Sequence, residues 1–312
     1  MTDADVVSDA PVLAVVGPTA TGKSDLGIAL AQHLGGAEIV NADSMQLYAG
    51  MDIGTAKVPV ADRGGVPHHL LDVWPVSKSA AAHEYQQLAR GVIAEIHGRG
   101  HVPVLVGGSG LYLRGVLDRV EFPGESPEIR ARLEAELEQV GPEVLHARLA
   151  DIDAEAAAGI LPSNGRRIVR ALEVVELTGG PFRATLPGFD SVYPRLIKVG
   201  IDRADLAERV DRRVEVMMAA GFLDEIRGLL PGLRGSPTAG KAIGYAQLLA
   251  VVDDDGRVTG DLDEAVDATK RRTRRFVKRQ RSWWRRDPRI VWLDGADPGL
   301  LDRAVDTLSA WG

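Results

Sequence analysis

The segment Gly17–Ser24, with the sequence GPTATGKS, constrains the fold of this chain more than any other feature. It follows a short apolar, β-branched run at Val12–Val16. It precedes a stretch in which apolar residues recur at helical spacing, namely Leu26, Ala29, Leu30 and Leu34. A glycine, four residues and then Gly-Lys-Ser between a strand and a helix fit the phosphate-binding P-loop. The sequence therefore predicts a strand, a phosphate loop and a helix in succession.

The chemistry of such a loop follows from its residue types. Its glycines let backbone N–H groups turn inward at a helix N-terminus, where they bind an anion. Lys23 adds a point charge, and the Ser24 hydroxyl can ligate Mg²⁺. The expected phosphate contacts are Gly17, Pro18, Thr19, Ala20, Thr21, Gly22, Lys23 and Ser24. A chance glycine-rich turn is the alternative, and a bound phosphate by itself fits a kinase donor, a stored nucleotide or a diphosphate leaving group equally well. The chain has no Asn-Lys-x-Asp motif for reading guanine, which disfavours a GTPase.

Strand and helix signals alternate on both sides of a helical middle section. Strands are expected at Ala37–Asn41, His101–Val106, Arg195–Ile201 and Arg289–Leu293, and a helix at Ala80–His97. This alternation predicts an α/β fold, a P-loop NTPase-like core with a mostly parallel sheet. From 121 to 194 helical patterns dominate, so we expect a helical insertion domain there, between core segments 1–120 and 195–312.

The last third of the chain is expected to hold two amphipathic helices and a C-terminal one. The first runs through Val210, Val214, Met217 and Met218, with Asp202 and Asp205 as plausible caps. The second runs through Ala265, Thr269, Phe276 and Trp283, and the third covers LLDRAVDTLSAW.

Composition excludes several classes of protein and indicates one partner. Cysteine is absent, which excludes disulfides, thiolate zinc sites and cysteine nucleophiles. The acidic N-terminus and the lack of a long apolar run indicate a cytoplasmic protein with no membrane association. The net charge is -7, yet residues 270–286 contain ten Lys or Arg and no acid. This local patch indicates an RNA partner, although a solvated helix face is the alternative.

Asp43 follows the second expected strand and is the strongest candidate for a catalytic group. The carboxyl ends of parallel strands form one edge of the sheet, so Asp43 is expected there, on a strand beside the P-loop strand. A carboxylate at this edge can act as a general base or bind Mg²⁺ through water. A turn-capping role for Asp43 is the alternative.

Seven ordered blocks resemble one known family. They are GPTATGKS, NADSMQLYAGMDIGTAK, PHHLLDV, VGGSGLYL, RRIVRALEV, KAIGYAQ and RRFVKRQRSWW. Together they look like the successive signatures of the tRNA dimethylallyltransferases, in the shorter bacterial form without a cysteine zinc finger. The resemblance implies that the P-loop holds the diphosphate of dimethylallyl diphosphate, while the exocyclic N6 of an adenine beside the tRNA anticodon attacks the allylic carbon.

The resemblance also implies roles for individual residues. Asp43 would be the base, Thr19 would contact the diphosphate or the amine, and Arg213 would stabilise the leaving diphosphate, with Arg209 one turn earlier. Mg²⁺ would bind at Ser24. For Arg213 a solvated helix face is the alternative.

The resemblance implies contacts with the anticodon stem-loop as well, and the target adenine must be flipped out to react. The expected tRNA-binding residues are Asp43, Ser44, Met45, Gln46, Ser109, Arg130, Arg166, Arg167, Arg170, Lys241, Gly244, Tyr245, Gln247, Arg274, Lys278 and Arg281. Arg274, Lys278, Arg281 and Arg285 would form one basic stripe on a helix. Phe276, Trp283 and Trp284 offer stacking faces, with core packing the alternative for the tryptophans. For Ser109 the alternative is a plain strand-to-helix turn.

Three alternative functions remain open from the sequence. A P-loop kinase of small molecules would use the same loop with ATP, a related prenyltransferase would act on free AMP or ADP, and an ATP-gated RNA-binding protein would use the loop as a switch. His68 and His69 are interpreted as structural because adjacent side chains diverge and no acidic cluster completes a metal shell. A monomer is expected.

Overall fold

The computed structural model of the protein describes residues 9–182, 186 and 188–311. Residues 1–8, which carry most of the argument against a signal peptide, lie outside the described part. Packing divides the chain into two compact units. Unit 1 comprises Met1–Asp118 and Ser191–Gly312, and unit 2 comprises Arg119–Asp190.

Unit 1 is built on a six-stranded sheet in which every pairing is parallel. The order is β3-β2-β4-β1-β5-β6. The strands are β1 (Val12–Val16), β2 (Ala37–Asn41), β3 (His68–His69), β4 (Val102–Gly107), β5 (Leu196–Asp202) and β6 (Ile290–Asp294). The expected α/β core with a parallel sheet is confirmed, and only the two-residue β3 was not foreseen.

The expected position of β2 was wrong in one respect. β2 does not neighbour the P-loop strand, because β4 lies between them and pairs with both, Leu13 with Val104 and Ile39 with Val104. Local sequence patterns do not encode this order, which depends on pairing between distant segments. All carboxyl ends of a parallel sheet share one edge, so Asp43 still lies on the same edge as the P-loop.

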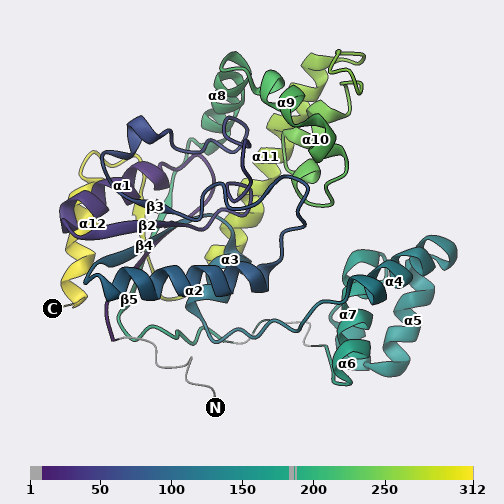
Figure 1. Ribbon diagram of the computed structural model, residues 1–312. Helices are drawn as coiled ribbons and strands as arrows, with labels where there is room; N and C mark the ends of the chain where they lie inside the picture. The colour runs from purple at the N-terminus through teal and green to yellow at the C-terminus, as the bar shows by residue number, and fades with distance from the viewer. Residues whose placement is uncertain (1–8, 183–185, 187, 312) are drawn as a thin grey trace. The chain divides into compact units, whose positions relative to one another are not determined.

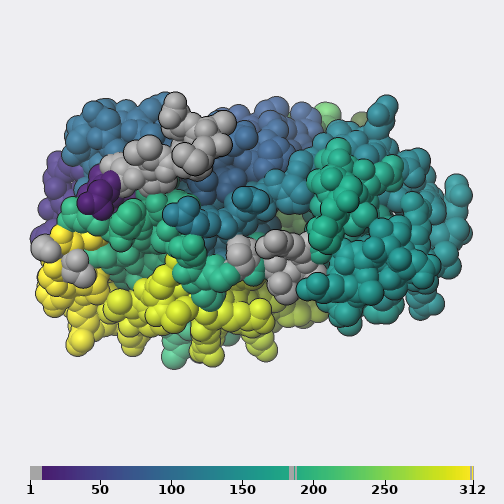
Figure 2. Space-filling view, turned by 90° about the horizontal axis from the view of Figure 1, so that it is seen from below, coloured from purple at the N-terminus to yellow at the C-terminus, as the bar shows by residue number. Residues whose placement is uncertain are grey.

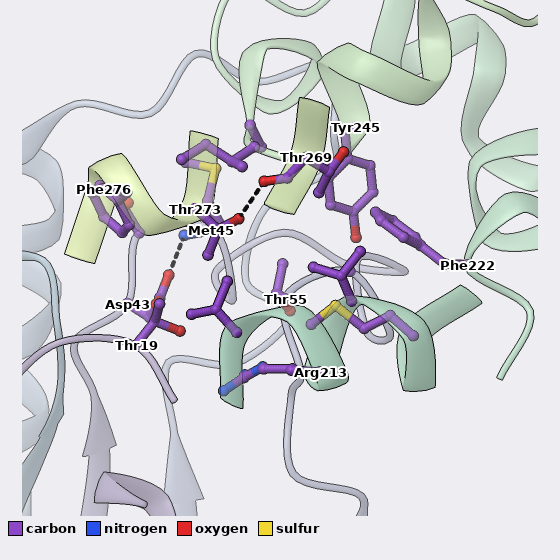
Figure 3. Close-up of a pocket in the computed structure, with 18 of the residues that line it drawn as sticks. Thr19, Asp43, Met45, Thr55, Arg213, Phe222, Tyr245, Thr269, Thr273 and Phe276 are labelled. Atoms are coloured by element: carbon purple, nitrogen blue, oxygen red, sulfur yellow. Dashed lines mark hydrogen bonds between the residues drawn. The ribbon is translucent and has the colours of Figure 1, made fainter. Parts of the chain in front are cut away.

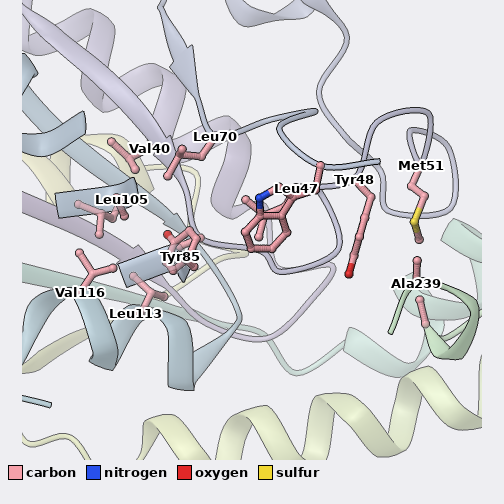
Figure 4. Packing of buried hydrophobic residues seen from close by; sticks show 14 of the residues in the cluster. Val40, Leu47, Tyr48, Met51, Leu70, Tyr85, Leu105, Leu113, Val116 and Ala239 are labelled. Carbon is pink, nitrogen blue, oxygen red and sulfur yellow. The ribbon is translucent and has the colours of Figure 1, made fainter. Parts of the chain in front are cut away.

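Helices cover both faces of the sheet (Figure 1). Alternate residues of β1 point to opposite faces, as the strand period requires. Leu13 and Val15 pack in a cluster with α1 (Lys23–Leu34) and α12 (Leu300–Leu308). Val12, Ala14 and Val16 pack in a second cluster with α2 (Ala82–Gly98) and α3 (Gly110–Leu117). Figure 4 shows part of this second cluster, where Tyr85, Leu113 and Val116 lie near Leu105 of β4.

Four further helices of unit 1 pack against one another and are grouped together in Figure 1. They are α8 (Leu206–Ala219), α9 (Phe222–Arg234), α10 (Tyr245–Leu249) and α11 (Leu262–Trp284). The sequence indicated α8 and α11 but not α9 or α10. Short 3-10 turns lie at Val60–Arg63, Ala239–Lys241 and Ser309–Trp311. The C-terminal part of the chain, yellow in Figure 2, forms a continuous band on one face.

Of the two expected caps of α8, Asp205 was right in position and Asp202 was wrong. Asp205 occupies the N-cap position, but its carboxylate makes no capping hydrogen bond and instead accepts from the Arg203 guanidinium, at 2.9 and 3.0 Å. Asp202 accepts from Arg281 Nε at 2.9 Å. Both carboxylates are thus engaged by arginines, which offer stronger charge-assisted hydrogen bonds than a backbone N–H.

Unit 2 is helical in all its described elements. These are α4 (Pro127–Val140), α5 (Pro142–Ile152), α6 (Ala154–Ala158) and α7 (Gly165–Thr178). α4 begins sharply because Ser126 Oγ accepts from Ile129 N and Pro127 follows at the first helical position. Leu133, Leu149 and Ile168 form part of its buried core. Among the described residues of the whole chain, no helix has the length and apolar character needed to span a membrane.

Candidate active site

The P-loop has the backbone that an anion-binding loop requires. It connects β1 to α1, and its Gly17 and Gly22 have φ of 144° and 97°. At Gly17 a side chain is excluded twice, since a Cβ would also lie 2.3 Å from the carbonyl oxygen of Ile201. Gly22 is the N-cap of α1 and offers no side-chain cap. The first N–H groups of α1 are therefore left for a bound anion.

The side chain of Lys23 carries a positive charge that a bound anion would balance. Its Nζ donates to the carbonyl oxygen of Pro18 at 2.6 Å. Burial, together with the nearby Arg213, lowers the pKa of Lys23 to about 8, although Asp43 opposes the shift. Two cations close together are costly without an anion between them. A diphosphate bound at the loop would relieve this cost.

Asp43 lines a cavity of about 310 Å³ at the carboxyl edge of the sheet (Figure 3). Its Oδ1 accepts from Met45 N at 2.9 Å, and its own N–H donates to Asn41 Oδ1 at 2.9 Å. Asp43 therefore both caps the turn and lines the cavity. The turn fixes one carboxylate oxygen and leaves Oδ2 for a ligand.

The cavity combines polar and apolar walls. Polar groups come from Thr19, Asp43, Ser44, Ser109, Arg213 and Lys241, and apolar groups include Val210, Val214, Met217, Phe222 and Phe276. Figure 3 shows Thr19 and Asp43 together near the strand ends, with Phe222 and Tyr245 at the other side. Such a cavity suits a ligand with one charged and one hydrocarbon part.

The two arginines of α8 lie differently. Arg213 lines the cavity, and burial lowers its pKa while Asp43 and Asp25 oppose the shift. Arg209 donates from Nε to the carbonyl oxygen of Ala20 at 2.8 Å. Arg213 can therefore reach a ligand, and Arg209 holds the backbone of the P-loop.

The loop after β4 is attached to the loop after β2. Ser109 Oγ accepts from Ser44 N at 3.0 Å and lies 3.3 Å from Ser44 Oγ. Gly107 permits this approach, because a Cβ there would lie 2.1 Å from the carbonyl oxygen of Ala42. Ser109 is thus more than a turn residue, since it fixes the backbone next to Asp43.

Glu225 of α9 is a functional candidate that sequence reasoning missed. Its carboxylate accepts from three consecutive backbone N–H groups, Asp52 at 2.8 Å, Ile53 at 2.6 Å and Gly54 at 3.1 Å. It also accepts from the Tyr245 hydroxyl at 2.5 Å. Gly54 and Tyr245 both line the cavity, so Glu225 shapes the wall from behind. An acid in the first turn of a helix was the available signal.

The predicted tRNA contacts near the cavity have distinct positions. Met45, Lys241, Gly244 and Tyr245 line it together with Ser44 and Ser109. Gln46 Nε2 donates to the carbonyl oxygen of Thr55 at 3.1 Å. Gln247 Oε1 accepts from Gly244 N at 2.9 Å. These two glutamines hold backbone segments of the wall rather than lining the cavity themselves.

The basic stripe on α11 is partly neutralised within the chain. Arg274 is paired with Asp211 at 2.5 Å, and Arg281 with Asp202 at 2.8 Å. Lys278 is exposed, and no described residue forms an ion pair with it. Trp284 is 1% exposed, so the expectation that it offers a stacking face was wrong. Trp284 packs in the core instead, and Trp283 is partly buried against the same cluster.

The predicted arginines of unit 2 form two groups. Arg130 and Arg170 both donate to the fully buried Glu173, at 2.8 and 3.0 Å. Arg166 and Arg167 are exposed at the start of α7. Arg166 and Arg167 are therefore the accessible pair on this helix.

The two adjacent histidines have structural partners. His68 Nδ1 lies 2.8 Å from the carbonyl oxygen of Val66, and His69 Nε2 lies 2.6 Å from Glu38 Oε2. Within the described ranges no group of three His, Asp or Glu side chains could hold a metal ion. The interpretation of these histidines as structural agrees with this geometry.

Comparisons with known proteins point to one family. The family model described as IPP transferase matches residues 46–287. A tRNA dimethylallyltransferase of Streptomyces coelicolor is 60% identical, over 94% of this chain and 92% of that protein. One from Thermobifida fusca is 58% identical with the same coverage.

Solved structures agree. The full-length tRNA isopentenylpyrophosphate transferase of Bacillus halodurans is 38% identical, with a TM-score of 0.66 over 96% of this chain and 97% of that one. A eukaryotic dimethylallyltransferase acting on tRNA is 26% identical, with a TM-score of 0.76 over 96% of this chain and 78% of that one. The family model spans most of the sequence, and the relatives match almost its whole length. The chain therefore belongs to the IPP transferase family.

Proposed function

We propose that this protein is a tRNA dimethylallyltransferase, which transfers a dimethylallyl group from dimethylallyl diphosphate to N6 of the adenine beside the anticodon. The observation that carries the proposal is the cavity in which Asp43, Thr19 and Arg213 face one another beside the P-loop. Carboxylate, hydroxyl and guanidinium are the groups that alkylation of an amine by an allylic diphosphate needs. The names of the relatives support the same activity.

The diphosphate of the donor would bind at the P-loop. The free N–H groups at the start of α1 and the cation of Lys23 lie at the end of β1, where the loop turns. Arg213 adds a second cation from the cavity wall. Negative charge on the diphosphate grows as the carbon–oxygen bond breaks, so these cations bind the transition state more tightly than the substrate.

Asp43 would take the proton from the attacking amine. In the balanced step, N6 forms a bond to the allylic carbon, the carbon–oxygen bond breaks, diphosphate leaves and the N6 proton passes to the carboxylate. Met45 N holds Oδ1 of Asp43, which orients the remaining oxygen toward the cavity. Thr19, on the opposite loop, supplies a hydroxyl to position diphosphate or amine.

The apolar side of the cavity suits the hydrocarbon group. Val210, Val214, Met217 and Phe222 line it and would exclude water from the allylic carbon. Exclusion of water protects a reactive carbon from hydrolysis. A small-molecule kinase acting on a hydroxyl would have no use for such a wall.

The residues present also fit a Mg²⁺ ion. Ser24 lies in the first turn of α1, directly after Lys23 of the phosphate loop. Mg²⁺ prefers oxygen ligands and keeps several waters, so a hydroxyl, water and diphosphate oxygens form a suitable set. When bound, the ion would neutralise charge on the leaving diphosphate.

The RNA would be bound by exposed basic residues on α11 and α7, and its adenine flipped into the cavity. Lys278 on α11, and Arg166 and Arg167 on α7, are exposed and would contact phosphates. We further propose that the helical segment 121–194 acts as the anticodon-stem contact, and that the protein works in the cytoplasm as a monomer.

One incubation tests this function. The protein is mixed with Mg²⁺, labelled dimethylallyl diphosphate and unmodified tRNA, with ATP omitted. Label in the RNA supports the proposal, and the modified nucleoside should be N6-dimethylallyl adenosine after digestion. Label only in added free AMP would instead identify the related nucleotide prenyltransferase. No label in either acceptor would contradict the proposal.

A further inference from the structure

Gln280 is a polar residue buried near the C-terminal end of α11, the most basic helix among the described residues. It is 6% exposed, and it lies on the side of α11 that carries Val277 and Trp284. Val277 packs in a small cluster with Ala20 of the P-loop. The inner face of α11 therefore contacts the phosphate loop, while Lys278, directly after Val277, stays exposed.

The amide of Gln280 connects the ends of two strands. Its Oε1 accepts from Thr19 N at 3.0 Å, and its Nε2 donates to the carbonyl oxygen of Gly108 at 3.1 Å. Only one orientation of the amide satisfies both partners, because one is a donor and the other an acceptor. Thr19 belongs to the loop after β1, and Gly108 to the loop after β4.

Each of these loops leads to a reacting group. The side chain of Thr19 lines the cavity. Gly108 precedes Ser109, whose Oγ binds Ser44 N next to Asp43. One side chain thus sets the spacing between the donor-binding loop and the loop that holds the base.

Two glycines in the segment after β4 allow α11 to pack closely, because they have no side chain. A Cβ on Gly108 would lie 2.4 Å from Gln280 Nε2, and one on Gly110 would lie 2.0 Å from Trp283 Nε1. Neither glycine has a positive φ, so close packing and not backbone conformation requires them. Gly108 and Gly110 are therefore the counterparts of Gln280 and Trp283.

We propose that Gln280 is a positioning residue that holds Thr19 and the Gly108–Ser109 loop in register, so that donor and base face each other at reacting distance. The proposal rests on the proposed function for the reaction that it tunes. Gln280 touches neither substrate, and it acts through the backbone of Thr19 and Gly108. Displacements of about 1 Å in such an arrangement cost roughly 100-fold in rate.

The test compares Gln280→Met with Gln86→Met. Methionine keeps the length of glutamine and loses both hydrogen bonds. Gln86 donates to the carbonyl oxygen of Gly115 at 2.6 Å between α2 and α3, and it does not line the cavity, so the same substitution there is the matched control. For Gln280→Met we expect kcat at saturating tRNA to fall on the order of 10- to 100-fold, while the Kd for tRNA stays within about twofold of wild type. For Gln86→Met we expect kcat to stay close to wild type.

Gly108→Ala provides a second, independent variant. Its new methyl group would displace the Gln280 amide, so we expect the same kinetic defect. In the double variant Gly108→Ala/Gln280→Met the defect should not multiply, because both changes remove one contact. Multiplying defects, a kcat for Gln280→Met equal to that of Gln86→Met, or a loss confined to tRNA affinity would each overturn the proposal.

Pyrophosphate binding separates this inference from the proposed function. The Kd for pyrophosphate with Mg²⁺ can be measured by calorimetry without any transfer. Gln280→Met should weaken pyrophosphate binding several-fold, because it loses the hydrogen bonds that hold Thr19 and Gly108 in place. Gln86→Met should leave the pyrophosphate Kd unchanged. If wild type transferred no label to RNA, the proposed function would fail, and this difference in pyrophosphate affinity would still support the positioning of the loop by Gln280. An unchanged pyrophosphate Kd would overturn it.

Discussion

The Tyr245 hydroxyl donates a 2.5 Å hydrogen bond to Glu225, which also accepts from three backbone N–H groups at Asp52, Ile53 and Gly54. Burial and the adjacent Glu225 carboxylate both raise the pKa of Tyr245, so the phenol stays protonated and remains a donor. This pair joins α9 and α10 to a loop that lines the cavity. The wall of the cavity is therefore held by a carboxylate that is not itself a cavity residue.

We expect Glu225→Gln to destabilise the protein by about 1–3 kcal/mol, because an amide has one accepting oxygen where the carboxylate serves four donors. The free energy of unfolding in urea measures this loss. Tyr245→Phe, which removes one donor and leaves Glu225 with three, is the milder control. A Glu225→Gln variant as stable as wild type would show that the loop does not depend on these hydrogen bonds.

Lys23 predicts a pH dependence of diphosphate binding. Its pKa is lowered to about 8 in the folded protein, and the protonated form is the one that binds an anion. The affinity for pyrophosphate should thus be highest below pH 8 and fall up to about tenfold per pH unit above it. Calorimetric titrations between pH 6.5 and pH 9.5 would measure this. Lys23→Arg, which stays charged throughout, should remove the inflection near pH 8.

The lowered pKa of Lys23 also affects stability, which rises with pH where pyrophosphate affinity falls. Unfolded Lys23 keeps its proton up to its ordinary pKa of 10.5, whereas the folded residue loses it near a pKa of about 8. Between these values the unfolded state binds more protons, so this residue makes the free energy of unfolding rise with pH. Below pH 8 its full destabilising effect is present. Lys23→Met should abolish this contribution, and a Lys23→Met variant with an unchanged slope in that interval would contradict the assignment.

Asp43→Asn should stop transfer and leave tRNA binding in place. Asparagine can still accept from Met45 N through its carbonyl oxygen, so the turn after β2 is preserved, but it cannot take a proton. Loss of a general base costs roughly 100- to 10,000-fold. Single-turnover transfer to tRNA, with a parallel filter-binding Kd, measures both quantities. Transfer within about tenfold of wild type would rule out Asp43 as the base.

Much of the fold was predictable because its signals are local. The P-loop, five of the six strands and helices such as α1 and α11 follow from periodicity and from glycine positions within short windows. The order of the strands was not, since β4 comes between β1 and β2 through pairing of distant segments. Asp202 looked like a helix cap, but Arg281, 79 positions away, binds it.

The site residues were also predictable only where local sequence patterns mark them. Thr19, Asp43 and Arg213 do line one cavity. Gln280 and Glu225 were missed because their partners lie 261 and 171 to 173 positions away, and no local pattern marks a side chain that acts through distant backbone. Aromatic residues among arginines are typical of RNA-binding segments, so the sequence predicts a stacking face at Trp284. A helix with one buried face produces the same pattern, and Trp284 lies on that buried face.

Lys278 and Arg274 make a matched pair for testing RNA contacts on α11. Both are basic residues of the same helix, but Lys278 is exposed without an ion pair among the described residues, whereas Arg274 binds Asp211 at 2.5 Å. A phosphate contact releases counterions, so Lys278→Ala should weaken tRNA binding and reduce the slope of log K against log salt by about 1. Arg274→Ala should change that slope less, because its charge is already balanced by Asp211. Filter binding from about 50 to 200 mM salt measures both slopes. Equal slopes for the two variants would show that ion pairing within the chain does not decide which basic residues of α11 contact RNA.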